Sequence, residues 1–422
     1  MDRITVPAGS RNFQRNGKPL FLLADTLWTA FSNITDAEWT EYLDFRAAQG
    51  FNAFQANILT QWDGGKPDSG LYPFAMNPDG TYDFHSINEA YFERVRAMLS
   101  QAVQRGITPV LVLLWLSYVK GTWLTKKDES GTMPLEHVKP YVEFAAKAFQ
   151  EFHPVYLLSG DTDFNAESEA YYLAALETLR AADPSAAVSA HIAGGISQLP
   201  ESLGGKLDFV MYQSCHFPDK LHWAYELAEA LYRHYPQQPV MNGEPCYEAH
   251  AFGGRYGRYS RFDVRKAVWQ SLLSGAGAGV SYGAQGVWSW HRPGKSFSNE
   301  SFGGKPMEWR KALELKGAWD ASFAKWVFEN YALWDMLPRQ EAVLNDTAEI
   351  RLSVSRDLKK VAAYIPYNDE IRLAVDLDGY DVLLIQLEER LFTTPSIIHQ
   401  DGVSVIPMHS MNSDALLIAV KP

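Results

Sequence analysis

Eight short apolar segments recur along the first two thirds of the chain, and a helical pattern separates most of them from the next. The segments are residues 19–25, 51–57, 107–115, 154–161, 187–191, 208–214, 238–244 and 278–283. Strands that helices cover on both faces read as continuous apolar runs, so this alternation predicts a parallel sheet flanked by helices. A count of eight favours a closed (β/α)8 TIM barrel over an open doubly wound sheet. No dinucleotide-binding glycine motif follows the first segment, which also weakens the open alternative.

The predicted helices have recognisable ends. Thr35 and Glu38 stand in capping-box spacing where a helix over residues 35–50 would begin. Gly50 follows its last turn, where glycine is favoured. Further helices are predicted over residues 87–106, 135–152, 166–184, 219–236, 263–275 and 307–330.

The pattern changes near residue 340 to apolar residues at every second position. Runs such as residues 349–355, 380–387 and 415–422 are separated by turn residues, which indicates antiparallel strands. A chain of 422 residues is long enough for one large and one small domain. We therefore expect a catalytic barrel over residues 1–338 and a small antiparallel β-sandwich over residues 339–422.

Composition limits the partners and the compartment. The net charge of −12 without a block of Lys or Arg argues against nucleic acid or a membrane surface as a partner. Only Cys215 and Cys246 are present, and the first residues lack the pattern of a secretory signal, so a cytoplasmic location is expected. The aromatic content of 13% suits a large core and also a sugar-binding cleft. Aromatic residues on several helices are compatible with a homo-oligomer, although the sequence does not fix the oligomeric state.

Polar and aromatic residues gather where the apolar segments end. In a (β/α)8 barrel the carboxyl ends of the strands form one concave face, so these residues are candidates for substrate contact. Taken singly, each has a structural explanation, such as a helix cap or a hydrogen-bonded core residue. The candidates are Asp25, Trp28, Gln55, Asn57, Trp115, Asp161, Asp163, His191, Tyr212, Gln213, His216, Glu244, Tyr282, Trp288 and Trp290.

Asp161 and Glu244 form the pair with the clearest chemical meaning. They follow the fourth and seventh predicted strands, which lie across a barrel mouth, and glycoside hydrolysis needs two carboxyl groups. Pro245 disfavours helical geometry at Glu244, so its carboxylate is expected to project from an extended strand end. Asp163 competes with Asp161 for the acid role. Glu248, further into the loop, is expected to form a surface or sugar-hydroxyl contact.

Three other functions are considered. Residues 279–283, Gly-Val-Ser-Tyr-Gly, match the motif of serine esterases, but no helical pattern follows Ser281 as that motif requires. The glycines of this segment are instead expected to allow close packing of the last strand. No metal-binding motif is present, and we expect neither a metal nor a cofactor. A barrel that binds carbohydrate without cleaving it would use the same aromatic cleft and stays the main alternative.

Four segments of the chain stand out as motifs: NGKPLFLLADTLWTAF, YLDFRAAQGFNAFQANIL, NGEPCYE and GAGAGVSYGAQGVWSW. Together they resemble segments of the apiosidase-like glycoside hydrolases, family 140 and its relatives. The sequence SGDT at 159–162 stands where the family more usually has Gly-Gly-Asp-Arg. The carboxyl-terminal segment 359–368 also resembles the family's β-sandwich, a domain sometimes labelled collagen-binding.

The resemblance implies a retaining (β/α)8 glycosidase with a carboxyl-terminal β-sandwich. By motif, Asp161 would be the acid/base and Glu244 the nucleophile. We expect the substrate to be a plant- or microbe-derived oligosaccharide, whose sugar rings and hydroxyls the other strand-end residues would bind. The sequence leaves open the sugar, the linkage and whether chain ends or interiors are cleaved.

Overall fold

The computed structural model describes residues 1–408 and 413–422 of the chain. All eight predicted barrel strands are present and form one parallel sheet in the order β10-β11-β14-β3-β4-β7-β8-β9. A parallel bridge between His191 and Met211 joins β9 to β10 and closes the barrel. The strands are β3 (Leu22–Thr26), β4 (Ala53–Asn57), β7 (Thr108–Trp115), β8 (Val155–Gly160), β9 (Val188–Ser189), β10 (Val210–Gln213), β11 (Val240–Glu244) and β14 (Gly279–Tyr282).

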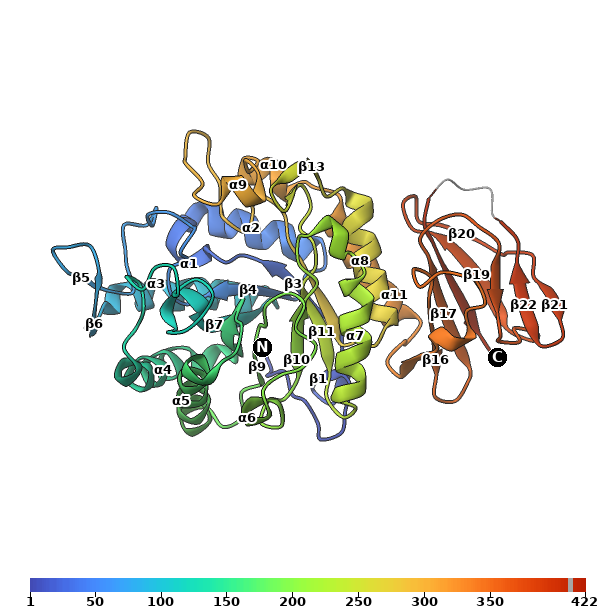
Figure 1. Cartoon of the computed structure of the whole chain (residues 1–422), viewed down its shortest axis with the longest axis horizontal. Coiled ribbons are helices and arrows are strands. Elements are labelled where there is room, and N and C mark those ends of the chain that lie inside the picture. Colours follow the sequence, from blue (N-terminus) through green and yellow to red (C-terminus); the bar gives the residue numbers. More distant parts are fainter. Residues whose placement is uncertain (409–412) are drawn as a thin grey trace.

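Seven longer helices surround the barrel, as the sequence predicts (Figure 1). Thr35 and Glu38 form the expected capping box, in which each side chain bonds the other residue's backbone N–H. The helices are α2 (Asp36–Ala48), α3 (Glu89–Gln104), α4 (Leu135–Phe149), α5 (Ala166–Ala182), α7 (Trp223–His234), α8 (Arg261–Leu273) and α11 (Gly317–Asn330). Within the described residues, none is both long and apolar enough to cross a bilayer.

Two predicted elements are divided in the structure. Residues 18–20 form β2 (Lys18–Leu20), which pairs with β1 (Phe13–Arg15), and the barrel strand starts only at Leu22. The helix expected over 307–330 is α10 (Trp309–Leu313) followed by α11. Its second half begins anew because Glu248, 69 residues away in sequence, accepts a hydrogen bond from the Gly317 N–H at the start of α11. A cap supplied from a distant loop cannot be read from the local sequence.

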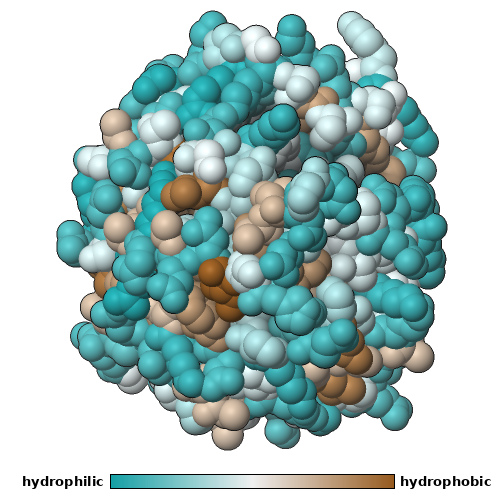
Figure 2. Space-filling view, turned by 90° about the vertical axis from the view of Figure 1, so that its left-hand side faces the viewer, coloured by the Kyte–Doolittle hydropathy of each residue, from teal (hydrophilic) through white to brown (hydrophobic). Residues whose placement is uncertain are grey.

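Several short strands and helices lie in the loops that connect the barrel elements. Two of them, β5 (Phe74–Met76) and β6 (Tyr82–Ile87), form a hairpin at the end of the molecule away from the carboxyl-terminal domain (Figure 1). The face on that side is mainly hydrophilic, with apolar side chains scattered among polar ones (Figure 2). Further small elements are β12 (Ala251–Phe252), β13 (Arg255–Arg258), α1 (Ala30–Asn33), α6 (Glu201–Gly204) and α9 (Glu300–Gly303).

The carboxyl-terminal domain is built of two antiparallel sheets. A six-stranded sheet has the order β15-β16-β17-β23-β19-β20, and a three-stranded sheet has the order β18-β22-β21. Alternate residues of the large sheet pack in opposite directions. Val361 and Ala363 face the core that the two sheets share, whereas Ala362 and Tyr364 join the core of the barrel. The strands are β15 (Met336–Pro338), β16 (Arg351–Ser355), β17 (Lys360–Ile365), β18 (Ile371–Leu373), β19 (Asp381–Gln386), β20 (Leu391–Thr393), β21 (Ile398–Gln400), β22 (Val403–Ile406) and β23 (Ala415–Val420).

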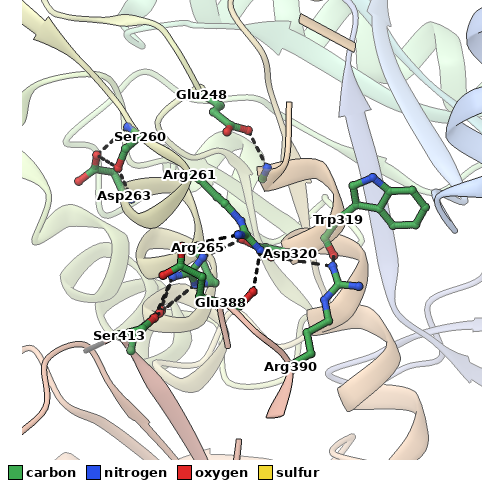
Figure 3. Close-up of polar contacts among 12 residues, drawn as sticks. Glu248, Ser260, Arg261, Asp263, Arg265, Trp319, Asp320, Glu388, Arg390 and Ser413 are labelled. Atoms are coloured by element: carbon green, nitrogen blue, oxygen red, sulfur yellow. Dashed lines mark hydrogen bonds and ion pairs between the residues drawn. The ribbon is translucent and has the colours of Figure 1, made fainter. Parts of the chain in front are cut away.

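A buried ionic network fastens this domain to helices α8 and α11 of the barrel (Figures 1 and 3). Arg265 of α8 binds Asp414, which precedes β23, through Nη2 at 2.5 Å, and binds Asp320 of α11 through Nη1 at 2.8 Å. Tyr364 donates a hydrogen bond to the same Asp414 carboxylate. The side chains of Arg265, Asp320 and Asp414 are at most 3% exposed. The two domains therefore share a continuous, desolvated interface.

Candidate active site

A cavity of about 700 Å³ opens at the carboxyl ends of the barrel strands. This is the face on which (β/α)8 enzymes carry their reactive groups. The cavity has both polar and aromatic walls, as expected of a small-molecule site. Of the residues proposed from the sequence, those that line it are Trp28, Trp115, Asp161, Gln213, His216, Glu244 and Trp288.

Glu244, the last residue of β11, is buried between two imidazoles. His216 Nε2 lies 2.9 Å from Oε1, and His191 Nε2 lies 3.1 Å from Oε2. Backbone N–H groups fix both rings in the same tautomer, since Asp161 N–H donates to His191 Nδ1 and Tyr247 N–H donates to His216 Nδ1. Each Nε2 is then left as the N–H that faces the carboxylate, even when the ring is neutral.

This environment keeps Glu244 ionised. Burial alone would raise its pKa, but the interactions with His191 and His216 outweigh burial and lower the pKa to about 2. A carboxylate that is charged at neutral pH and holds no proton is suited to act as a nucleophile.

Asp161 follows β8 and has the opposite character. Its backbone lies in the left-handed region, with φ of 50°, a conformation that Asp tolerates better than most residues. Gln213 Nε2 donates a hydrogen bond to Oδ1. Burial and the negative charge of Glu244 raise the pKa of Asp161 well above its usual range, although the Gln213 bond acts in the other direction. Asp161 therefore holds a proton under conditions in which Glu244 does not.

A single imidazole ring links the two carboxyl residues. His191 accepts from the backbone of Asp161 at Nδ1 and faces Glu244 at Nε2. Its ring stacks on Trp115 at 5.8 Å and meets the edge of Trp28 at 5.5 Å. Trp115 can lie there because Gly160 has no side chain: an added Cβ would come within 1.9 Å of the indole. His191 is fully buried and does not line the cavity, so the structure gives it a supporting place below Glu244.

The loop after Glu244 is anchored by Glu248. This side chain is 5% exposed and accepts a hydrogen bond from the Tyr282 hydroxyl. It also accepts one from Gly317 N–H (Figure 3). The expectation of a surface or sugar contact for Glu248 is therefore corrected, because both contacts are internal. The anchored loop brings Tyr247 to the cavity wall, with its ring against Gly283, where an added Cβ would lie only 2.1 Å away. Close packing thus accounts for this glycine, which directly follows the last barrel strand.

Four other candidates have their polar groups used inside the protein. Asp25 is fully buried and binds Arg46 Nε at 2.7 Å and the Tyr42 hydroxyl at 2.9 Å. Tyr212 donates to the Ala224 carbonyl of α7, on the outer side of the sheet. The structure places Asp25, Tyr212 and Tyr282 away from the cavity, which corrects their expected contact with substrate. Trp290 is likewise outside, stacked on Trp309 at 4.1 Å.

Three further candidates lie next to the cavity without lining it. Gln55 donates from Nε2 to the Gly243 carbonyl at 2.6 Å, inside the barrel. Asn57 donates to Gln61 Oε1 and so holds a residue that does line the cavity. Asp163 accepts from the backbone N–H of Trp123, and its side chain is 37% exposed. Asp163 therefore orders the loop that carries Trp123, and the cap of α5 is Asn165 rather than either aspartate.

Much of the cavity wall comes from residues that the sequence reasoning missed. Most of them lie in loops well beyond the strand ends, where position alone gives no signal. The one local signal in the sequence is the pair Trp62 and Asp63 after Gln61, because an aromatic ring next to a carboxylate is typical of a sugar-binding loop. The missed residues are Gln61, Trp62, Asp63, Trp123, Leu124, Lys127, Gly194, Cys215, Phe217, Tyr247, His250, Asn299 and Phe302.

The esterase alternative does not fit the structure. Ser281 is fully buried in the middle of β14, and its hydroxyl donates to the Gly243 carbonyl. A nucleophilic serine would instead stand at an exposed turn between strand and helix. Among the residues that the structure describes, no group of three or more His, Cys, Asp or Glu is placed to hold a metal ion.

The closed barrel with its cavity at the carboxyl ends of the strands defines a class of protein, the (β/α)8 barrel proteins. A solved structure described as a glycoside hydrolase shares 18% sequence identity, with a TM-score of 0.82 and coverage of 100% of this chain and 97% of that one. A glycoside hydrolase family 5 structure from Bacteroides vulgatus ATCC 8482 shares 20% identity, with a TM-score of 0.82 and coverage of 99% and 93%. At these identities the likeness establishes the fold. A search of curated proteins finds no match to the chain.

Residues 8–335 match the model of the apiosidase-like catalytic domain, and the chain belongs to that family of glycoside hydrolases. The match covers most of the chain and spans the whole barrel, which carries the cavity. It confirms the family that the strand-end motifs indicated.

Proposed function

We propose that the protein is a retaining glycosidase in which Glu244 is the nucleophile and Asp161 the general acid and base. The observation that carries the proposal is the contrast between two carboxyl groups in one cavity. The pKa of Glu244 is lowered by its two histidines, and the pKa of Asp161 is raised by burial and by the charge of Glu244. Two carboxyl groups whose environments push their pKa values apart are the requirement of this chemistry.

In the first step Asp161 gives its proton to the glycosidic oxygen as the bond from that oxygen to the anomeric carbon breaks. Glu244 forms the new bond to the same carbon, and the leaving sugar departs as an alcohol. The resulting ester no longer carries the negative charge of Glu244. Because that charge raises the pKa of Asp161, its loss favours the ionised form of Asp161 that the next step needs.

In the second step Asp161 takes a proton from water while the water oxygen attacks the anomeric carbon and displaces Glu244. The product keeps the anomeric configuration of the substrate, since the carbon is inverted twice. Both steps use the chain's own carboxyl groups. We propose an oligosaccharide as substrate, because the cavity combines hydrogen-bonding groups with tryptophan side chains that offer apolar faces to sugar rings.

The test is hydrolysis of aryl glycosides and plant oligosaccharides, apiosides included, by wild type, Glu244→Gln and a control, Glu89→Gln. Glu89 is exposed at the start of α3 and does not line the cavity. We expect wild type and the control to release sugar and Glu244→Gln to be inactive while still folded. Activated fluoro-glycosides that trap the intermediate should label wild type at Glu244, which mass spectrometry of peptides would detect.

Inverted anomeric product would contradict the retaining mechanism. Sugar binding without release by wild type would instead favour the non-catalytic carbohydrate-binding barrel.

A further inference from the structure

Two tryptophans stand on the cavity wall across from Glu244. In the barrel β7 lies opposite β11, because β14, β3 and β4 separate the two strands on one side and β10, β9 and β8 on the other. Glu244 ends β11, whereas Trp62 and Trp123 belong to the loops that follow β4 and β7. Both indoles line the cavity. The catalytic steps above do not use either of them.

The direction of the leaving group follows from the chemistry proposed for Glu244. Each step of a retaining mechanism inverts the anomeric carbon, so the nucleophile forms its bond on the side opposite to the leaving oxygen. The leaving group therefore points away from Glu244. Asp161, which would donate the proton to that oxygen, follows β8, the neighbour of β7 in the sheet. The leaving group should accordingly extend toward the loops after β4 and β7.

Trp123 is held beside the proposed acid. Its indole Nε1 donates to the Asp161 carbonyl at 3.2 Å, and its backbone N–H donates to Asp163 Oδ1 at 2.9 Å. The Gly121 carbonyl of the same loop accepts from Asn165 Nδ2 at 2.7 Å. The loop is thus fixed to the segment that carries Asp161, and the position of the Trp123 ring is set before a ligand arrives.

Trp62 forms a corner with Trp123. The two ring centroids lie 6.4 Å apart, and the ring planes meet at 87°. On the same wall the Lys127 ammonium lies 5.4 Å from the Trp123 ring, where it can donate to a hydroxyl of a ligand. Aromatic rings with a few polar groups among them are suited to hold a sugar ring.

The purely structural explanation is that Trp123 only anchors its loop. The bonds made by the Trp123 backbone and by Asn165 already do so without the indole ring. Trp62 is 40% exposed, and the Trp123 side chain is also partly open on the cavity wall. A ligand that covers these rings gains free energy from the apolar surface it buries. Two open rings next to the acid therefore point to a ring-shaped leaving group.

We propose that Trp62 and Trp123 form the subsite for the leaving group, and that the substrate carries a sugar ring rather than a small alcohol on that side of the bond. The inference rests on the proposed glycosidase function, because it assigns the leaving-group side of the same reaction. A contact made only with the leaving group serves the first step and is lost once that group has departed. A contact with the reacting sugar would serve both steps.

The experiment compares kcat/KM for two substrates that share the reacting sugar. One has a sugar as its leaving group, and the other is the glycosyl fluoride, whose leaving atom is too small to reach the subsite. The enzymes are wild type, Trp62→Ala, Trp123→Ala, Trp123→Phe and the control Trp319→Ala. Trp319 is 41% exposed on α11 and does not line the cavity (Figure 3).

The two Ala variants of the subsite should be selective in what they lose. Each should lose about 10-fold on the sugar leaving group and stay within about twofold of wild type on the fluoride. Trp319→Ala should match wild type on both substrates.

Trp123→Phe separates contact with the leaving group from an effect on Asp161. Fluoride leaves with little help from an acid, so a misplaced Asp161 would also spare that substrate. The Phe variant keeps an aromatic ring and removes the N–H that donates to the Asp161 carbonyl. It should stay within about threefold of wild type on the sugar leaving group, and Trp123→Ala should keep the alkaline limb of the wild-type pH profile. A loss as large as that of Trp123→Ala, or a displaced alkaline limb, would mean that Trp123 acts through Asp161 and would overturn the inference.

The inference is also overturned if wild type is active and depends on Glu244, while the two Ala variants lose equally on both substrates or on neither. That result would leave the glycosidase function standing. Trp62→Ala, at an exposed position, decides the question if the thermal midpoint shows that Trp123→Ala is unfolded. If wild type and Glu244→Gln were equally inert or equally active on all glycosides, the proposed function would fail, and the subsite would fail with it.

Discussion

His216 Nε2 lies 2.9 Å from Oε1 of Glu244, while the Nδ1 of the same ring accepts a hydrogen bond from the backbone N–H of Tyr247. The loop that follows Glu244 in the sequence thus returns to orient the ring that holds the Glu244 carboxylate. Glu248 anchors this loop through Tyr282 and Gly317. The position and charge of Glu244 therefore depend on the folded loop as well as on its own strand.

The first prediction concerns the pH dependence of the wild type. The proposed mechanism needs Glu244 ionised and Asp161 protonated. Since the pKa of Glu244 is about 2, its ionisation is complete throughout the range above about pH 4. The pKa of Asp161 is raised, so kcat/KM should fall on the alkaline side as Asp161 loses its proton. A profile of kcat/KM against pH checks this, and an activity that rises steadily through alkaline pH would contradict the assignment of Asp161.

The second prediction is that His216→Ala moves the acid limb of the same profile to higher pH. The change removes one of the two interactions that lower the pKa of Glu244, while the burial that raises it remains. We expect a shift of about one pH unit or more, with a lower kcat. The matched control is His222→Ala, a partly exposed histidine next to α7. If the acid limb moved equally in both variants, His216 would have no specific effect on the pKa of Glu244, and the prediction would be wrong.

The third prediction separates a structural Asp25 from a substrate-binding one. Asp25→Asn leaves the buried Arg46 guanidinium without its charged partner, which should lower the free energy of unfolding by about 3 kcal/mol. The KM of the folded variant should stay within about twofold of wild type, because the side chain does not reach the cavity. Denaturant unfolding and steady-state kinetics measure the two quantities. A raised KM with an unchanged free energy of unfolding would instead indicate that Asp25 binds substrate.

The fourth prediction concerns the interface between the domains. Asp414→Asn removes a charge that Arg265 binds in a desolvated position, so it should lower stability by about 3 kcal/mol. Calorimetry should show a lower midpoint and a separation of the barrel and sandwich transitions. Activity at low temperature should persist, since no atom of this network lines the cavity. An unchanged thermogram would mean that the apolar contacts alone hold the domains together. As a control, Asp357→Asn alters an exposed turn of the same domain.

The order of helices and strands could be predicted from the sequence because each element has a local sequence pattern. Continuous apolar runs gave the eight strands, and capping residues such as Thr35 gave helix ends. Asp161 and Glu244 lie at the ends of β8 and β11, which β9 and β10 separate in the barrel, and both side chains line the one cavity. The cytoplasmic location and the oligomeric state stay predictions, since neither apolar runs nor helix-capping residues determine them.

The predictions of substrate contact were wrong for residues whose position at a strand end was right but whose side chains point away from the cavity. Successive side chains of a strand point to opposite faces, and a strand end does not show which residue points inward. Asp25 and Tyr282 are paired neighbours on adjacent strands, and both turn outward to Arg46. The polar character that made Asp25 look like a ligand for sugar serves a buried ion pair instead.

By itself the sequence determined the class of fold, because periodicity is a local property, and from strand-end position it predicted the carboxyl pair that we propose as catalytic. Only the tertiary structure decided the charges of that pair and the rest of the cavity wall. His191 and His216 reach Glu244 from the segments that follow β9 and β10, and Asp63 meets Asn299 across 236 residues of sequence. Burial and neighbouring groups set a pKa and a binding surface, and both exist only after distant segments have packed together.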